Sequence, residues 1–174
     1  MSDKRVTSLR IIHFPDPRLR KRCAPVEHFD AELAALAARM LELMREDKGV
    51  GLAAPQVGIN RRIFVCNVTG EPADDMVLAN PELTDLTGDE IGEEGCLSIP
   101  DVHVQMRRAK ECVLTARDLK GNPIRLKGVD LAARCWQHEC DHLNGKLIID
   151  HMSEADKIAN RKQLKKLESD FKNK

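Results

Sequence analysis

The chain has 174 residues, of which 42% are hydrophobic and 32% are charged, and its formal net charge at pH 7 is zero. This composition is ordinary for one globular domain that buries its own core. The zero net charge, an aromatic content of 3% and the absence of tyrosine argue against a general nucleic-acid-binding surface. No apolar stretch reaches membrane-spanning length, and the N-terminus lacks a signal peptide's hydrophobic core. We therefore expect a cytoplasmic protein with no membrane partner and with its six cysteines reduced.

The first element predicted along the chain is a helix. Residues 30–45 carry apolar side chains at steps of three and four, which is typical of an amphipathic helix. Residues 49–56 are too rich in small side chains for an ordinary strand, and such a loop exposes backbone N–H and C=O groups to a ligand. Strands are predicted over residues 62–68 and 76–80, and Asn80-Pro81 is expected to end the second one.

The second half starts with an acidic stretch, residues 85–94, which we interpret as a solvated loop at every position except Glu94. Residues 102–106 and 110–116 are expected to form a pair of strands. A turn at residues 120–122 then leads to a short return strand over residues 124–127.

Two more helices complete the predicted elements. The first begins at Asp130, a natural N-cap, and ends near residue 143 before Gly145. The second covers residues 153–171 with Ser153 as its N-cap. Its predicted apolar stripe is Ile158, Leu164, Leu167 and Phe171, and its basic face is Lys157, Arg161, Lys162, Lys165 and Lys166. We therefore predict a single α+β domain of mixed and antiparallel strands around a central metal-binding helix, with an N-terminal and a C-terminal helix.

The central helix carries the sequence His-Glu-Cys-Asp-His at residues 138–142. Two imidazoles four residues apart lie on one helix face, one turn apart, with Glu139 beside them. This pattern is typical of a two-histidine metal clamp with an adjacent base, although a surface helix with unliganded histidines also fits it. A third ligand has to decide, because catalytic zinc-type sites take three protein ligands and leave one position for water.

Downstream residues are poor candidates for that third ligand. One hydrolase pattern requires a histidine three residues after Gly145, but Ile148 stands there. His151, Glu154 and Glu168 have no convincing apolar enclosure.

An upstream cysteine is the better candidate. Cys96 lies between Gly95 and an apolar run, and a thiolate is a strong ligand for a borderline or soft ion. Cys140 is two residues from each histidine and points to another helix face, whereas Cys135 lies one turn away from the centre of the pair. Cys96 is therefore the predicted third ligand.

Three stretches of the chain together resemble the signatures of the peptide deformylases. They are Gly-Val-Gly-Leu-Ala-Ala-Pro-Gln at residues 49–56, Glu-Gly-Cys-Leu-Ser at 94–98 and Gln-His-Glu-Cys-Asp-His at 137–142. Members of this family are metallohydrolases that remove the formyl group from the formyl-methionine of new polypeptides and release formate. The likeness in element order covers residues 9–171, so the resemblance implies one catalytic domain over residues 1–174.

The resemblance also implies a role for each site residue. One divalent ion would be held by Cys96, His138 and His142, with Glu139 as the base. The ion is typically Fe(II) in the cell, although Zn, Ni or Co can be bound, and raw affinity favours zinc. The formyl oxygen would be bound by the Gln56 side chain and the Leu97 backbone N–H. The substrate-binding residues would be Val50, Gly51, Glu94, Leu131 and Cys135, with Glu94 and Gln137 also supporting the helix.

The basic helix at residues 153–171 has two interpretations, a solvated face or a docking surface. Bacterial deformylases with such a helix use it to dock on the ribosome near the peptide exit, so the resemblance favours docking. We expect a monomer, because no hydrophobic surface stripe requires a dimer. Two positions depart from common family patterns: His103 stands where an arginine is frequent near the substrate entrance, and Gly92 where an apolar pocket residue is frequent.

Two other functions use the same residues. A zinc endopeptidase would use His138, Glu139 and His142 with a downstream ligand. The other is a structural metal module or a ribosome-associated binding protein that has lost activity. A closed structural site would need a fourth side-chain ligand, and Glu139 would then have no reason to be acidic.

Overall fold

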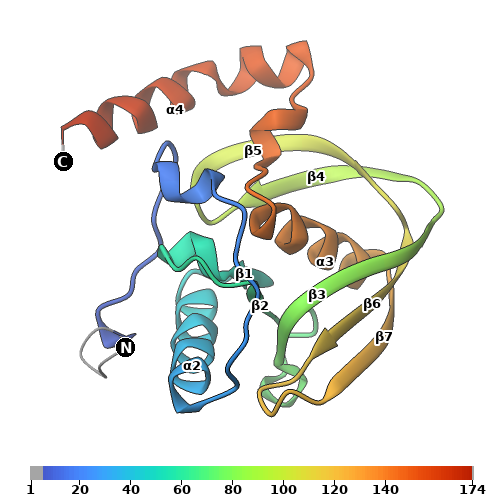
Figure 1. Ribbon diagram of the computed structural model, residues 1–174. Coiled ribbons are helices and arrows are strands. Elements are labelled where there is room, and N and C mark those ends of the chain that lie inside the picture. The colour runs from blue at the N-terminus through green and yellow to red at the C-terminus, as the bar shows by residue number, and fades with distance from the viewer. Residues whose placement is uncertain (1–5, 174) are drawn as a thin grey trace.

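A five-stranded antiparallel sheet is the largest element of the computed structural model, which describes residues 6–173 (Figure 1). Its strands lie in the order β1-β2-β3-β6-β7. Their bounds are Gly51–Ala53, Ile63–Cys66, Met76–Thr87, Glu111–Arg117 and Pro123–Val129. A separate antiparallel pair consists of β4 (Glu90–Cys96) and β5 (Ile99–Arg108). The α+β class and the antiparallel strands are therefore confirmed.

The α-helices that pack around these sheets in the described part of the chain are α2 (Ala31–Glu46), α3 (Asp130–Leu143) and α4 (Glu154–Lys172). In Figure 1, α3 runs through the middle of the molecule, α2 lies beside β1 and β2, and α4 lies across β5. Within the residues described, no helix has both the length and the apolar character that a membrane span requires.

The predictions for α2 and for the start of α4 are confirmed. Asp30 caps α2 by accepting a hydrogen bond of 2.9 Å from the Leu33 N–H. Ser153 caps α4 in a reciprocal arrangement with Asp156. The buried face of α2 packs against β1 and β2, so this helix supports the short strand β1 from behind.

The N-cap prediction for α3 is wrong. Val129 is the cap residue and makes no side-chain cap, and α3 is counted from Asp130, whose φ of +49° lies in the left-handed region. The reason is that β7 leads into α3 with no connecting loop. The Asp130 N–H donates instead to the Lys110 carbonyl at 2.9 Å.

The end of β3 and the nature of the acidic stretch were also predicted wrongly. β3 continues through Pro81 to Thr87, because a register shift between Ala79 and Glu82 accommodates the proline. The acidic stretch is not a loop, since its second half forms β4, whose partner is β5.

The predicted pairing of residues 102–106 with 110–116 is likewise wrong. β5 pairs with β4, and β6 pairs with β3 and with β7. The predicted turn and return strand are confirmed as the β6–β7 hairpin. Residues 49–56 contain a true strand, because β1 pairs with β2 and forms one edge of the large sheet.

Only half of the apolar stripe predicted for α4 faces the core. Leu167 is buried and Leu164 packs beside it, whereas Ile158 is 77% exposed and Phe171 is 39% exposed. Asn160 and Gln163 bind β5 from one face of α4, and Ile158 points away from β5 because it lies two residues before Asn160 on the helix.

Gly128 allows β7 to approach α3 closely. A Cβ atom at this position would lie 2.7 Å from Cε3 of the Trp136 ring, which is buried against the sheet. We expect Gly128→Ala to lower the free energy of unfolding by about 1–3 kcal/mol, since overpacking forces the ring or the strand to shift. Urea unfolding monitored by Trp136 fluorescence measures this, with the exposed Lys127→Ala as control. Equal stability of the two variants would contradict the expectation.

Candidate metal centre and active site

Three metal-binding atoms converge where α3 meets the end of β4. The Nε2 atoms of His138 and His142 lie 3.2 Å apart, and the Sγ atom of Cys96 lies 3.2 Å from the His142 Nε2. These three residues form a group whose ligand atoms all lie within 4.8 Å of one another. The predicted set of ligands is therefore brought together, although its members are 46 residues apart in the chain.

Glu94 fixes the orientation of the first imidazole. Its Oε2 atom lies 3.1 Å from Nδ1 of His138, which directs the other ring nitrogen toward Cys96 and His142. Glu94 also binds the buried guanidinium of Arg108 through two hydrogen bonds of 2.9 Å, and Arg134 through a third. Burial alone would raise the pKa of the Glu94 carboxyl, but the bonds from His138 and Arg108 outweigh burial and lower it to about 2. Glu94 is thus held as a carboxylate.

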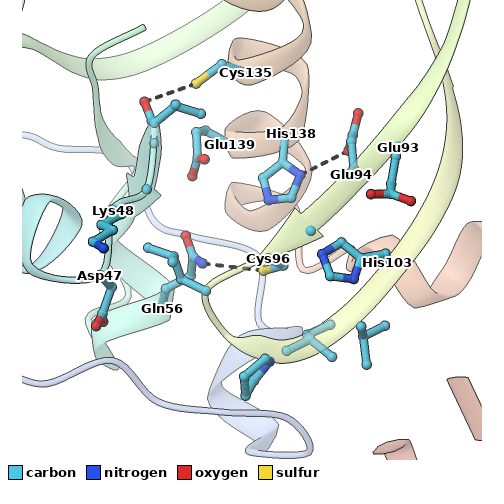
Figure 2. Close-up of a pocket in the computed structure, with 18 of the residues that line it drawn as sticks. Asp47, Lys48, Gln56, Glu93, Glu94, Cys96, His103, Cys135, His138 and Glu139 are labelled. Carbon is cyan, nitrogen blue, oxygen red and sulfur yellow. Dashed lines mark hydrogen bonds and ion pairs between the residues drawn. The ribbon is translucent and has the colours of Figure 1, made fainter. Parts of the chain in front are cut away.

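Glu139 occupies the position expected of a base. Its carboxylate is buried beside the three ligands, and its Oε2 atom has no hydrogen-bond partner among the described residues. Burial raises the pKa of this carboxyl to about 7, against the effect of the nearby His138. Figure 2 shows the carboxylate between Cys135 and His138, directed into a cavity.

The glycine at position 51 makes room for this carboxylate. A Cβ atom on Gly51 would collide with Oε1 of Glu139 and would lie 2.9 Å from Sγ of Cys135. The space taken by the Glu139 carboxylate is therefore a structural reason for glycine at this position.

Gln56 faces the metal ligands from the opposite wall. Its Oε1 atom accepts a hydrogen bond of 2.8 Å from the Ala53 N–H, which turns the amide nitrogen toward Cys96 Sγ at 3.6 Å and Ser98 Oγ at 3.3 Å. The side chain is almost completely buried. Its N–H groups therefore point at the centre of the site, beside the backbone of Leu97.

A cavity of about 740 Å³ opens in front of these groups. The residues predicted to bind substrate all line it, and they are Val50, Gly51, Glu94, Leu131 and Cys135. Val50 and Leu131 are 42% and 47% exposed, so they form an apolar rim. The Cys135 thiol donates to the Val50 carbonyl at 3.5 Å. A hydrogen bond with Cys66, together with burial, raises the pKa of this thiol well above its usual range, so it remains protonated.

Some residues singled out from the sequence lie elsewhere. Gln137 bonds the backbone of Ala109 and Ala133 and thereby ties α3 to the β5–β6 connection, away from the cavity. Gly92 is covered by the Arg134 guanidinium, which would lie 3.1 Å from an added Cβ. His103, by contrast, does line the cavity.

Arg108 is the supporting residue that the sequence analysis missed. It lies on β5, where Val102, Val104 and Met106 point inward at alternate positions, and it continues that inward series. It binds Glu94 on one side and Asp141 at 2.6 Å on the other. The strand alternation was therefore a usable signal, since a charged residue at an inward position requires a partner.

The ligand group fits a divalent ion in an open, catalytic arrangement. Two imidazole nitrogens and one thiol sulfur converge without a fourth side-chain ligand among residues 6–173. A closed structural site would need that fourth ligand. The downstream candidates His151, Glu154 and Glu168 do not belong to the group, which argues against the endopeptidase arrangement.

A three-ligand metal cluster with a buried carboxylate beside it, open to a cavity, defines a metal-dependent hydrolase. Comparison with known proteins makes the assignment specific. The family model described as polypeptide deformylase matches residues 8–158. A peptide deformylase of Hamiltonella defensa is 44% identical over 160 residues, which cover 92% of this chain and 94% of that protein.

Solved structures agree. A peptide deformylase from Legionella pneumophila superposes with a TM-score of 0.88 at 39% identity, covering 96% of this chain and 99% of that one. One from Thermotoga maritima gives a TM-score of 0.79 at 44% identity, covering 83% and 97%. The chain belongs to the polypeptide deformylase family. As a member of it, the protein is a metal-dependent hydrolase that removes the N-terminal formyl group from newly made polypeptides.

Proposed function

We propose that Cys96, His138 and His142 hold one divalent ion and that Glu139 is the general base for hydrolysis of N-terminal formyl-methionine. The observation that carries this proposal is the Glu139 carboxylate, buried with an unpartnered oxygen beside the three converging ligands. A buried carboxylate without a partner is costly, and such a cost is expected where the group serves a reaction.

The residues of the chain divide the chemical work. When bound, the ion supplies a Lewis acid that makes water a better nucleophile and polarises the formyl carbonyl. Glu139 takes a proton from the attacking water and delivers it to the departing amine. Glu94 keeps the His138 ring in the orientation that presents its Nε2 atom, through the hydrogen bond of 3.1 Å.

The formyl oxygen is bound by donors that are fixed in advance. The bond from the Ala53 N–H holds the Gln56 amide with its nitrogen toward Cys96. We assign the second donor to the Leu97 backbone N–H, next to Cys96 in the chain. Donors that need no rearrangement stabilise the charge that develops on this oxygen.

The methionine side chain is assigned to the apolar part of the cavity. Val50, Leu131 and Cys135 line it, and Cys135 stays a neutral thiol, which suits contact with a thioether. Gly51 belongs to the edge strand β1, whose outer edge can pair with the backbone of an extended peptide.

Fe(II) is the proposed ion in the cell, and the test of function starts from it. The protein is purified without oxygen, loaded with Fe(II), and assayed for amine release from a formyl-methionyl peptide and from its acetyl counterpart. We expect release from the formyl peptide alone, because the space beside Gln56 and Leu97 suits a small carbonyl.

No release of amine by protein with one ion bound per chain would overturn the proposal. The Fe(II)-loaded protein should lose activity in air and regain it with fresh Fe(II) and reductant, whereas a Zn-loaded sample should keep its activity in air. That difference would identify iron.

Gly51→Ala is expected to lower kcat about a hundredfold, since the new methyl group displaces the Glu139 carboxylate. Steady-state kinetics on the formyl peptide measure the loss, and metal analysis checks that the ion remains. Gly51→Ala combined with Cys135→Ala separates the two collisions. If the double variant regains the wild-type kcat, the cause is contact with Cys135 and not with Glu139.

We also propose that the exposed basic face of α4 docks on ribosomal RNA, and that the cytoplasmic protein is a monomer whose residues 1–174 form one catalytic domain. Five exposed Lys and Arg side chains form this face, and they are Lys157, Arg161, Lys162, Lys165 and Lys166. Binding to an anionic RNA surface should weaken steeply with salt. Cosedimentation with ribosomes from 50 to 300 mM KCl tests docking, and a variant with these five residues changed to Gln is the comparison.

Light scattering, which gives the mass of the particle in solution, tests whether the protein is a monomer.

A further inference from the structure

The outer edge of β5 is covered by side chains of α4 rather than by another strand. Among residues 6–173, β5 pairs with β4 alone, so its other edge presents backbone groups that need partners. The Asn160 side chain supplies two of them, because its Oδ1 atom accepts from the His103 N–H at 3.4 Å and its Nδ2 atom donates to the His103 carbonyl at 2.8 Å. Asn160 is itself only 8% exposed.

Gln163, one turn further along α4, binds the same strand. Its Nε2 atom donates to the Pro100 carbonyl at 3.0 Å and to Oδ2 of Asp101 at 3.3 Å. Asp101 has φ of +61°, a conformation that a non-glycine residue keeps only when its surroundings hold it. Gln163 thus binds the backbone of Pro100 and the side chain of Asp101.

The segment held in this way is a wall of the active-site cavity. Pro100, Asp101 and His103 all line the cavity. Figure 2 places His103 beyond Cys96 and on the opposite side of His138 from Cys135. The ring of His103 also lies over the backbone of Gly95, where an added Cβ would be 3.5 Å from it.

We propose that Asn160 and Gln163 are positioning residues that hold the cavity wall formed by residues 100–103 for the part of the peptide beyond methionine. This inference rests on the proposed function, which places the methionine side chain of the substrate at Val50, Leu131 and Cys135. The substrate residues after methionine then lie along the other wall. Both residues lie beyond residue 158, where the match to the family model ends. The C-terminal helix is therefore part of the substrate-binding apparatus of this chain.

The test compares a short and a long substrate on the full-length, metal-loaded protein. Formyl-methionine amide reaches only the metal ligands and the methionine pocket, whereas a formyl-methionyl tetrapeptide must also pass residues 100–103. Asn160→Ala and Gln163→Ala should each raise KM for the tetrapeptide about threefold to tenfold, the range that one lost hydrogen bond represents. Both kinetic constants for the short substrate and kcat for the tetrapeptide should stay unchanged. Glu168→Ala, an exposed change on the same helix, should alter neither.

Hydrogen exchange gives a measurement that does not depend on turnover. The amide of His103 should exchange faster in Asn160→Ala than in Glu168→Ala, because its acceptor has been removed. A double-mutant cycle of Asn160→Ala with Gln163→Ala completes the test, since two residues that hold the same wall should have non-additive effects on KM for the tetrapeptide.

Equal changes for both substrates, or no change in a folded variant, would overturn the inference. Gln163 is only partly buried, so Gln163→Ala keeps the test decisive if Asn160→Ala does not fold. Failure of the wild-type protein to act on formyl-methionine amide would instead refute the proposed function. The hydrogen-exchange measurement would still show whether Asn160 holds the backbone of His103.

Discussion

Replacing Glu139 by glutamine is expected to lower kcat by a factor on the order of a hundred to ten thousand, the range for loss of a general acid–base group. The change keeps the size of a side chain that is buried against Gly51, so the cavity should not rearrange. It removes only the ability to take the proton from water. KM should change little, because Glu139 is assigned to proton transfer and not to peptide binding.

Three measurements make this result specific. Kinetics on a formyl-methionyl peptide give kcat and KM, elemental analysis gives the metal content, and thermal unfolding shows whether the fold is intact. Glu82→Gln, at an exposed position on β3, is the matched control for the change in charge. Turnover near the wild-type rate in a metal-loaded Glu139→Gln protein would refute the proposed mechanism.

The elements that the sequence predicted correctly are those with local signals. α2 and α4 each begin after a capping residue, Asp30 or Ser153, and both carry apolar side chains at helical spacing. The predicted metal ligands also came from local signals, because two of them share one helix face and the third lies in a short motif. The structure brings them together, which such patterns imply but do not demonstrate.

The failures in the two sheets concern strand pairing, which depends on residues far apart in the chain. β5 pairs with β4 through a tight connection in which Cys96 faces Ile99, and only Leu97 and Ser98 lie between them. Neither residue is a typical hairpin-turn residue, so nothing local marked the turn. The acidic residues of β4 resembled a solvated loop for a related reason. Arg107 binds Asp89 just before β4, and Arg108 binds Glu94. These partners on the neighbouring strand become visible only once the pairing is known.

The same limit explains why Arg108 and Asn160 were missed. Each acts through contacts with residues distant in sequence: Arg108 reaches Glu94 and Asp141, and Asn160 reaches His103. Their own neighbours in the sequence predict an ordinary strand and an ordinary helix. A buried polar side chain needs partners, but the sequence does not specify where they are.

Replacing Cys96 by alanine is expected to abolish metal binding at one ion per chain, and activity with it. Two imidazoles alone make a much weaker site for a borderline ion, and the thiolate is the only anionic ligand among the three. The apoprotein should remain folded, because Cys96 is partly exposed and lies at the end of β4. Elemental analysis after dialysis and circular dichroism measure the two results.

The other cysteines near the helix provide the comparison that gives this experiment its meaning. Burial raises the pKa of the Cys140 thiol to about 12, and that side chain packs in the core cluster away from the cavity, so Cys140→Ala should keep both metal and activity. Cys135→Ala should also keep the metal, because its protonated thiol bonds the Val50 carbonyl and is not a ligand. It should raise KM instead, through loss of a wall of the methionine pocket. If Cys135→Ala lost the ion while Cys96→Ala kept it, the metal centre would have to be moved one turn along α3.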